Sequence, residues 1–157
     1  MLLSKAGDLG ERRVIEILIE NMGRVNYGPD LLDRKGITEG VLLGQQYLFG
    51  WTIFPLPLDD LSGLPFSPPH SADMPAFFRG MFQVSAAGDT FLALPGWTKG
   101  LCWVNGFNLG RYWSRGPQRT LYIPAPLLRE GENELIVFEL HGTDRHTVEF
   151  RDRADLG

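Results

Sequence analysis

Short apolar segments separated by turn residues recur along the chain, and their spacing is too short for long helices. The segments bounded by Gly, Pro, Asn or Asp predict strands over residues 77–84, 90–94, 101–104, 120–123 and 134–140. Asn105 and Gly106 follow one of these segments, and this dipeptide indicates a hairpin because both positions tolerate positive φ. We therefore expect a structural role for Asn105 and Gly106.

The first part of the chain also favours strands over helices. Residues 11–20 read ERRVIEILIE, and their β-branched content and flanking glycines indicate a largely buried strand. Two shorter strands are expected within residues 37–54, the second over 51–54. About eight strands at this spacing predict an all-β fold, a jelly-roll β-sandwich.

The segment 55–75 holds six of the eleven prolines, so we expect an extended connection without regular pairing. It could link two domains. Its apolar residues favour a loop packed against a sandwich, and these are Leu58, Leu61, Leu64 and Phe66.

An internal similarity suggests how the chain is organised. A Leu-Leu pair, a charged glycine turn and an apolar strand occur near the start and again over residues 127–140. We infer that residues 1–45 are the terminal strands of a first, truncated jelly roll plus a connection, and that 46–157 form a second one. The alternative is that two short patterns agree by chance. Truncation would expose apolar residues such as Ile15, Ile17 and Ile19, so we expect the chain to self-associate as a homo-oligomer.

The composition argues against several classes of function. The chain has 157 residues and a net charge of -4, which gives no general attraction to nucleic acid or to an anionic membrane. The single cysteine, Cys102, excludes an internal disulfide, and no Cys/His cluster suggests a metal site. We find no signal peptide, membrane span or Asn-X-Ser/Thr sequon, and we expect a soluble domain without cofactors whose compartment stays open.

The carboxylates offer little sign of catalysis. Asp59, Asp60, Glu132 and Glu134 lie in turns or at their edges, where solvated charge is expected, whereas Glu139 lies on a strand that could bury it. Glycoside hydrolysis needs two carboxylates across a sugar, and no spacing here selects such a pair. We therefore predict no catalytic residue.

Aromatic and basic residues concentrate in the segment 96–118, GWTKGLCWVNGFNLGRYWSRGPQ. In a sugar site, Trp97 and Trp113 would stack on a galactose ring while Arg111 binds its hydroxyls. In a structural interpretation these tryptophans and Trp103 fill the core, and Arg111 pairs with a buried carboxylate. The residues alone favour the structural interpretation.

Several motifs, in order along nearly the whole chain, resemble the C-terminal part of glycoside hydrolase family 35 β-galactosidases, the group of the lysosomal acid and β-galactosidase-1-like enzymes. They are ENMGRVNYG (20–28), WTIFPL (51–56), GWTKG (96–100), VNGFNLGRYW (104–113), GPQ (116–118) and TLYIP (120–124).

The resemblance implies a partial enzyme. In that family a TIM barrel carries both catalytic glutamates, and two galactose-binding-like jelly rolls pack against it. This chain matches the end of the first jelly roll and the second, so it is expected to be inactive alone and to have the barrel as its partner. Tyr27 matches a tyrosine near the galactose pocket, and Arg24 matches an arginine of the same loop, to which we give a structural role.

Three hypotheses follow. The chain is the non-catalytic β-sandwich portion of a β-galactosidase, or an independent lectin-like module that binds galactosides, or an independent hydrolase. The first predicts buried tryptophans in the segment 96–118, and the second an exposed aromatic flanked by polar groups. The third requires two facing carboxylates at the separations typical of glycosidases.

Overall fold

The computed structural model describes residues 14–23, 25–67 and 74–157, and the chain divides into two compact units, Met1–Pro57 and Leu58–Gly157. The boundary predicted between residues 45 and 46 lies earlier in the chain than this division. In the described residues, the regular structure consists of strands and two short 3-10 helices, η1 (Pro29–Leu32) and η2 (Ala125–Leu127). The prediction of an all-β protein is therefore confirmed.

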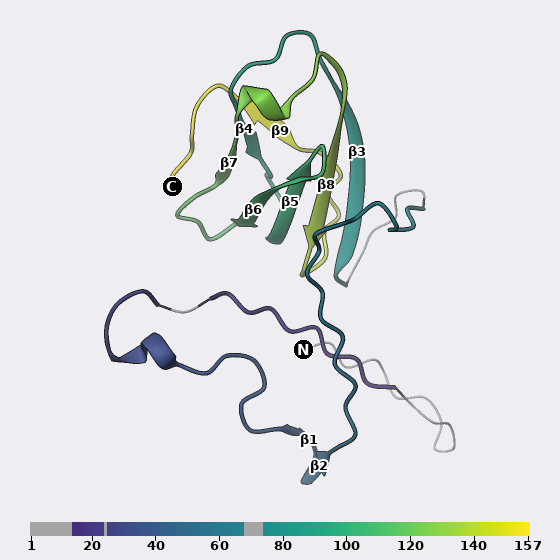
Figure 1. Cartoon of the computed structure of the whole chain (residues 1–157), viewed down its shortest axis with the longest axis vertical. Helices are drawn as coiled ribbons and strands as arrows, with labels where there is room; N and C mark the ends of the chain where they lie inside the picture. The colour runs from purple at the N-terminus through teal and green to yellow at the C-terminus, as the bar shows by residue number, and fades with distance from the viewer. Residues whose placement is uncertain (1–13, 24, 68–73) are drawn as a thin grey trace. The chain divides into compact units, whose positions relative to one another are not determined.

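The second unit is a β-sandwich of two antiparallel sheets (Figure 1). One sheet has the order β3-β8-β5-β6, and the other has the order β7-β4-β9. Their bounds are β3 (Ala76–Val84), β4 (Thr90–Ala93), β5 (Lys99–Val104), β6 (Phe107–Trp113), β7 (Thr120–Ile123), β8 (Gly131–Glu139) and β9 (Glu149–Arg151). The strands predicted for this half are confirmed. The short β9 was not predicted, because three residues carry too little alternation to be read as a strand.

A hairpin joins β5 and β6 at the predicted dipeptide. Asn105 has φ 48° and Gly106 has φ 83°, and Val104 pairs with Phe107 on either side of them. Both turn residues therefore adopt the left-handed conformation that a tight two-residue hairpin requires.

The first unit has much less regular structure. Its strands are β1 (Val41–Leu43) and β2 (Gln46–Leu48), which form an antiparallel pair. The strands predicted over 11–20 and 51–54 are wrong for the residues described, since 14–20 and 51–54 are not in strands. An apolar β-branched segment becomes a strand only when another strand accepts its backbone hydrogen bonds. Within the part of the chain that the structure describes, no strand pairs with 14–20 or with 51–54.

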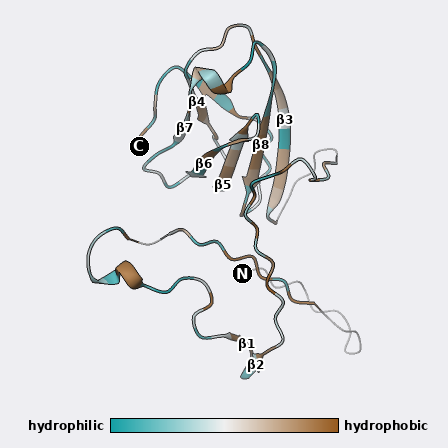
Figure 2. Cartoon of the chain, in the orientation of Figure 1, coloured by the Kyte–Doolittle hydropathy of each residue, from teal (hydrophilic) through white to brown (hydrophobic). Residues whose placement is uncertain are grey.

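The main core lies between the two sheets of the second unit. Buried apolar side chains come from β4, β5, β7 and β8, so both sheets contribute to one cluster. They include Leu92, Cys102, Val104, Leu121, Ile123, Leu135 and Val137. Figure 2 shows β5 and β8 as predominantly hydrophobic strands.

A second cluster covers the opposite face of the four-stranded sheet. Trp103, Ile136 and Phe138 are buried there, beneath Leu58, Leu61 and Phe66 of the proline-rich segment. The prediction that this segment packs on the sandwich is therefore confirmed for these three residues. Because both faces of β8 are covered, its residues from Leu135 to Glu139 are all buried.

One row of residues crosses the four-stranded sheet at Gly100. Gly100 is paired with Glu139 on one side and with Tyr112 on the other. The Tyr112 hydroxyl reaches past Gly100 and donates a hydrogen bond of 2.9 Å to the Glu139 carboxylate. A Cβ atom at Gly100 would overlap the Phe138 carbonyl oxygen and lie 2.9 Å from the Tyr112 hydroxyl. The absence of a side chain at residue 100 is therefore required.

We predict that Gly100→Ala destabilises the protein by at least about 3 kcal/mol, because the methyl group overlaps backbone in a packed core. Gly80→Ala is the matched control, since Gly80 also lies within a strand and a Cβ there has no atom within 4 Å. The control should change the free energy of unfolding by less than about 1 kcal/mol. Urea unfolding of both variants measures the difference, and equal effects would contradict the close approach at Gly100.

Candidate functional site

Glu139 is fully buried at the end of β8 and is surrounded by hydrogen-bond donors. Its carboxylate accepts from the backbone N–H groups of Thr98 (2.8 Å), His141 (2.9 Å) and Lys99 (3.3 Å), and from the Tyr112 hydroxyl. These donors occupy both oxygens, as a buried charge requires. Glu139 therefore has a structural role, and its burial leaves no access for a substrate.

The predicted pairing of Arg111 with a buried carboxylate is wrong. The partners of Glu139 come from Tyr112 and from backbone N–H groups, whereas the Arg111 guanidinium lies 5.7 Å from the centre of the Trp113 ring. Adjacent residues of a strand point to opposite faces, so Tyr112 enters the core and Arg111 does not.

Burial and the Glu139 charge also act on two neighbouring groups. Burial, and then the negative charge of Glu139, raise the pKa of the Cys102 thiol well above its ordinary range. The same two causes raise the pKa of the Tyr112 phenol. Both groups stay protonated at neutral pH, so Cys102 is a core residue that lacks the thiolate needed by a nucleophile.

The aromatic residues of the segment 96–118 lie in two different environments. Trp97 and Trp103 are buried, and the Trp97 indole N–H donates to the Thr147 carbonyl oxygen at 2.9 Å. Trp113 is half-exposed and is surrounded by cations. Lys99 Nζ lies 5.0 Å from its ring centre, and the guanidinium carbons of Arg111 and Arg115 lie at 5.7 and 5.8 Å. Within this segment, Trp113 and Arg111 are thus the accessible members of the predicted sugar-binding residues.

The two predicted residues of the first unit lie in one loop. Tyr27 is 90% exposed and precedes η1. Arg24 lies outside the described residues. The substrate roles expected of Tyr27, Trp97, Arg111 and Trp113 stay predictions, as does the role of Arg24.

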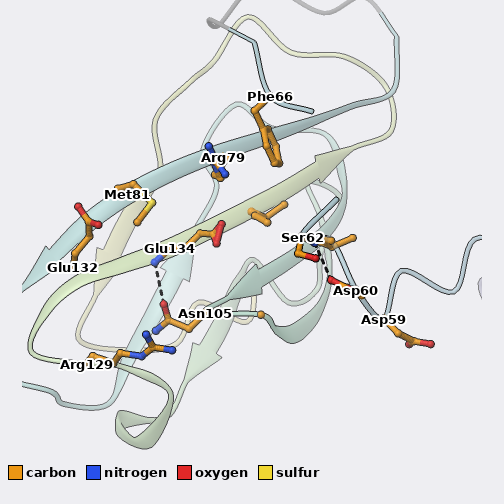
Figure 3. A pocket seen from close by; sticks show the side chains of 13 residues that line it. Asp59, Asp60, Ser62, Phe66, Arg79, Met81, Asn105, Arg129, Glu132 and Glu134 are labelled. Atoms are coloured by element: carbon orange, nitrogen blue, oxygen red, sulfur yellow. Dashed lines mark hydrogen bonds between the residues drawn. The ribbon is translucent and has the colours of Figure 1, made fainter. Parts of the chain in front are cut away.

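A pocket of about 560 Å³ lies within the second unit, on the face of the four-stranded sheet that the proline-rich segment partly covers (Figure 3). Strands β3 and β8 contribute Arg79, Met81, Glu132, Glu134 and Ile136. The proline-rich segment contributes Asp59, Asp60, Leu61, Ser62 and Phe66, and the remaining lining residues are Asn105, Gly106 and Arg129.

Two buried or half-buried asparagines determine the backbone around this pocket. The Asn105 side chain donates to Leu127 O (2.7 Å) and to the side-chain oxygen of Asn133 (2.8 Å), and it accepts from the Glu134 N–H (3.0 Å). Asn133 in turn accepts from the Arg129 N–H and donates to the Arg129 carbonyl oxygen. The backbone positions of Arg129 and Glu134 are therefore set by one hydrogen-bonded network.

Sequence reasoning did not find this pocket. The sequence alone indicates that Asp59, Asp60, Glu132 and Glu134 are solvated turn residues, because nothing in it shows which strands are adjacent. The available signal was the period of two that places Arg79 and Met81 on one face of β3, and Glu132 and Glu134 on one face of β8. Only the register, with Met81 opposite Glu134, brings these two sets together.

The described residues contain neither a metal-binding cluster nor a membrane-spanning helix. No group of three or more His, Cys, Asp or Glu side chains in ranges 14–23, 25–67 and 74–157 is placed to hold a metal ion. Over the same ranges, no helix is long and apolar enough to cross a membrane.

Comparisons with known proteins agree with this architecture of β-domains. Residues 5–57 match the family model for the first all-beta domain of beta-galactosidase, and residues 75–133 match the model for its galactose-binding domain. Together the two matches cover more than half of the chain. By these two domains, the chain belongs to the β-galactosidase family.

Individual relatives show the same relationship. A mouse beta-galactosidase-1-like protein is 45% identical over 96% of this chain and 25% of its own length. Beta-galactosidase 17 of Arabidopsis thaliana is 46% identical over 79% of this chain and 21% of its own length, and the human beta-galactosidase-1-like protein 2 is 46% identical over 80% and 21%. The chain thus spans about a quarter or less of the length of these relatives.

We predict that Glu139→Gln lowers the free energy of unfolding by about 3 kcal/mol, because the new amide places a donor against donors in a buried site. Glu134→Gln makes the same chemical change on the same strand, where the side chain is half-buried, and should cost less than about 1 kcal/mol. Thermal or urea unfolding measures both variants. A loss for Glu139→Gln no larger than for its control would show that the four donors do not depend on the carboxylate.

Proposed function

We propose that this chain is the non-catalytic C-terminal β-sandwich portion of a β-galactosidase, a hydrolase of terminal β-D-galactosyl residues. Its role is to support a TIM-barrel catalytic domain that this sequence does not contain. The observation that carries the proposal is the first unit: none of its described residues is buried, although residues 5–57 match the first all-beta domain of the family. A domain segment without a buried residue needs a further partner.

The exposed side chains of the first unit indicate what the partner must supply. Large apolar residues are exposed along this unit, and Figure 2 shows hydrophobic stretches in it, including η1. The most exposed are Tyr27 (90%), Phe49 (87%), Ile53 (86%) and Leu32 (83%). Burying one such side chain contributes about 1.5–3 kcal/mol, so an apolar partner surface would stabilise the unit substantially. The catalytic barrel of the parent enzyme is that partner, with Tyr27 at the edge of the galactose pocket.

We expect the chain alone to release no nitrophenol from p-nitrophenyl β-D-galactoside, and to bind the separately produced barrel domain of the parent enzyme. Ile53→Asp should weaken this binding at least about tenfold, because it places a charge in an apolar contact. Isothermal titration calorimetry measures the affinity.

Leu156→Asp is the control, since Leu156 is 69% exposed and lies in the second unit near the end of the chain. It should leave the affinity for the barrel unchanged. Galactoside hydrolysis by the chain alone, or a barrel that does not bind it, would refute the proposal.

A second candidate function is a galactoside-binding module, and Trp113 is the observation that favours it. Its ring is half-exposed beside the exposed side chains of Arg111 and Arg115, a combination that suits a sugar ring and its hydroxyls. The burial of Trp97 and Trp103 supports the scaffold role instead.

A two-dimensional amide NMR titration with galactose decides between these two functions. For a scaffold, the tryptophan indole signals should be dispersed and should not move. For a galactoside-binding module, the Trp113 indole should shift saturably, and Arg111→Met should weaken that response because it removes the guanidinium donors. A shift that survives Arg111→Met unchanged would contradict a site at Trp113.

A further inference from the structure

Strand β3 lies at one edge of the four-stranded sheet, where β8 is its only partner among the described strands (Figure 1). The pairing is continuous from Ala76 to Val84, so the outer side of β3 presents an equally long row of backbone groups. Outside that ladder, no backbone hydrogen bond joins a residue of β3 to another part of the described chain. The N–H and C=O groups on this side are therefore open to pairing with a further strand.

The other edges of the two sheets carry features that hinder such pairing. Strand β6 pairs with β5 through a register shift, and β7 and β9 have only four and three residues. Strand β3 has nine residues, with neither proline nor lysine. Its one charged residue is Arg79, whose guanidinium lies 4.6 Å from the centre of the Phe66 ring. A long, regular edge of this kind is a template for another strand.

The sequence of β3 is nearly symmetric about Gly80, with Phe78 two residues before it and Phe82 two residues after it. If two copies of β3 pair antiparallel with Gly80 opposite its counterpart, Phe78 of one copy lies opposite Phe82 of the other. Directly opposed residues point to the same face of a sheet, and both phenylalanines pack against the main core. This register therefore continues the core from one copy into the next.

Gly80 also leaves space where the two strands would meet. A Cβ atom built on Gly80 has no atom within 4 Å, so nothing in the same copy fills the position at the centre of the symmetric register. A second backbone can therefore approach β3 there without displacing a side chain.

The opposite face of the joined sheet has complementary charges. In the same register Arg79 of one copy lies opposite Met81 of the other, and Met81 is paired with Glu134. Arg79 and Glu134 of different copies thus lie in one row, two strands or about 10 Å apart, a separation that their side chains can close. Within the described part of one copy, no ion pair joins either residue to a partner.

We propose that two copies of this chain dimerise through β3, with the strands antiparallel about Gly80, so that the two four-stranded sheets become one sheet of eight strands. The pairing satisfies the outer backbone groups of both copies. All of these residues belong to the second unit, so the dimer is separate from binding of a barrel domain and from association through the first unit. The contact is confined to one strand and its neighbours, and we expect a dissociation constant of about 10–100 µM.

Sedimentation equilibrium of the intact 157-residue chain tests the dimer. Met81→Lys should weaken association at least about tenfold, because it places a lysine opposite Arg79 of the other copy, twice in each dimer. Phe107→Lys is the control, since Phe107 is 53% exposed, Met81 is 54% exposed, and Phe107 lies on β6 at the other edge of the same sheet. It should leave association unchanged. Thermal unfolding verifies that both variants retain the fold.

A second substitution should restore the dimer. When Arg79→Glu is combined with Met81→Lys, each new lysine lies opposite a new glutamate of the other copy. The double variant should therefore associate at least about tenfold more tightly than Met81→Lys alone. Such a rescue separates a contact between two copies from a loss of folding.

A disulfide locates the centre of the pairing. Only at the central residue do the two equivalent Cα atoms lie about 4.5–5.5 Å apart, which a disulfide can span. Gly80→Cys should therefore give a covalent dimer on mild oxidation. Gln83→Cys should not, because Gln83 lies opposite Phe77 of the other copy and about 20 Å from its own counterpart. The native Cys102 is buried and does not compete.

Several outcomes would overturn the proposal. A chain that stays monomeric up to about 500 µM does not form this dimer. Association that survives Met81→Lys but is lost with Ile53→Asp would place the contact in the first unit. Equal losses with Met81→Lys and Phe107→Lys would show a general effect of added charge, and a covalent dimer of Gln83→Cys but not of Gly80→Cys would exclude the symmetric register.

Discussion

The second unit depends on one buried interaction, the hydrogen bonding of the Glu139 carboxylate. An unpaired charge in a protein core costs several kcal/mol, so the surrounding chain must supply donors to both oxygens. Tyr112 supplies one across Gly100, and the backbone at Thr98, Lys99 and His141 supplies the others. These donors belong to β5, β6 and the ends of loops, so satisfying one carboxylate aligns three strands of the same sheet.

A comparable polar network operates at the opposite end of β8. Asn105, in the β5–β6 turn, donates to Asn133, which lies near the start of β8 and is almost completely buried. Together, the carboxylate at one end and the amides at the other define the register of the central strand pair. The separate pairing of β3 with β8 places Met81 opposite Glu134, and both residues line the pocket. The structural and candidate binding residues therefore alternate along the same strand, on its two faces.

The two units differ in what they can bury. In the sandwich, two sheets enclose a core, and Leu58, Leu61 and Phe66 cover the outer face of the four-stranded sheet. The first unit has one short hairpin and no buried residue among those described, while several of its large apolar side chains are exposed. This contrast is the physical basis for the supporting role proposed here. The family relationship agrees with this contrast, since the matched relatives are about four times as long as this chain or longer.

The sequence by itself determined the all-β class, most strands of the sandwich, the Asn105–Gly106 hairpin and the packing of the proline-rich segment. Those features depend on the alternation of apolar and polar residues, on turn residues and on apolar spacing, all of which involve residues close together in the sequence. The motifs from 20 to 124 also indicated the β-galactosidase family. The sequence did not predict that residues 14–20 lie outside any strand, since strand pairing depends on a partner strand elsewhere in the chain. Nor did it show that Tyr112, and not Arg111, reaches Glu139, or that four segments enclose a pocket. Only the tertiary structure decided these, because strand register and the order of strands in a sheet set which distant side chains meet.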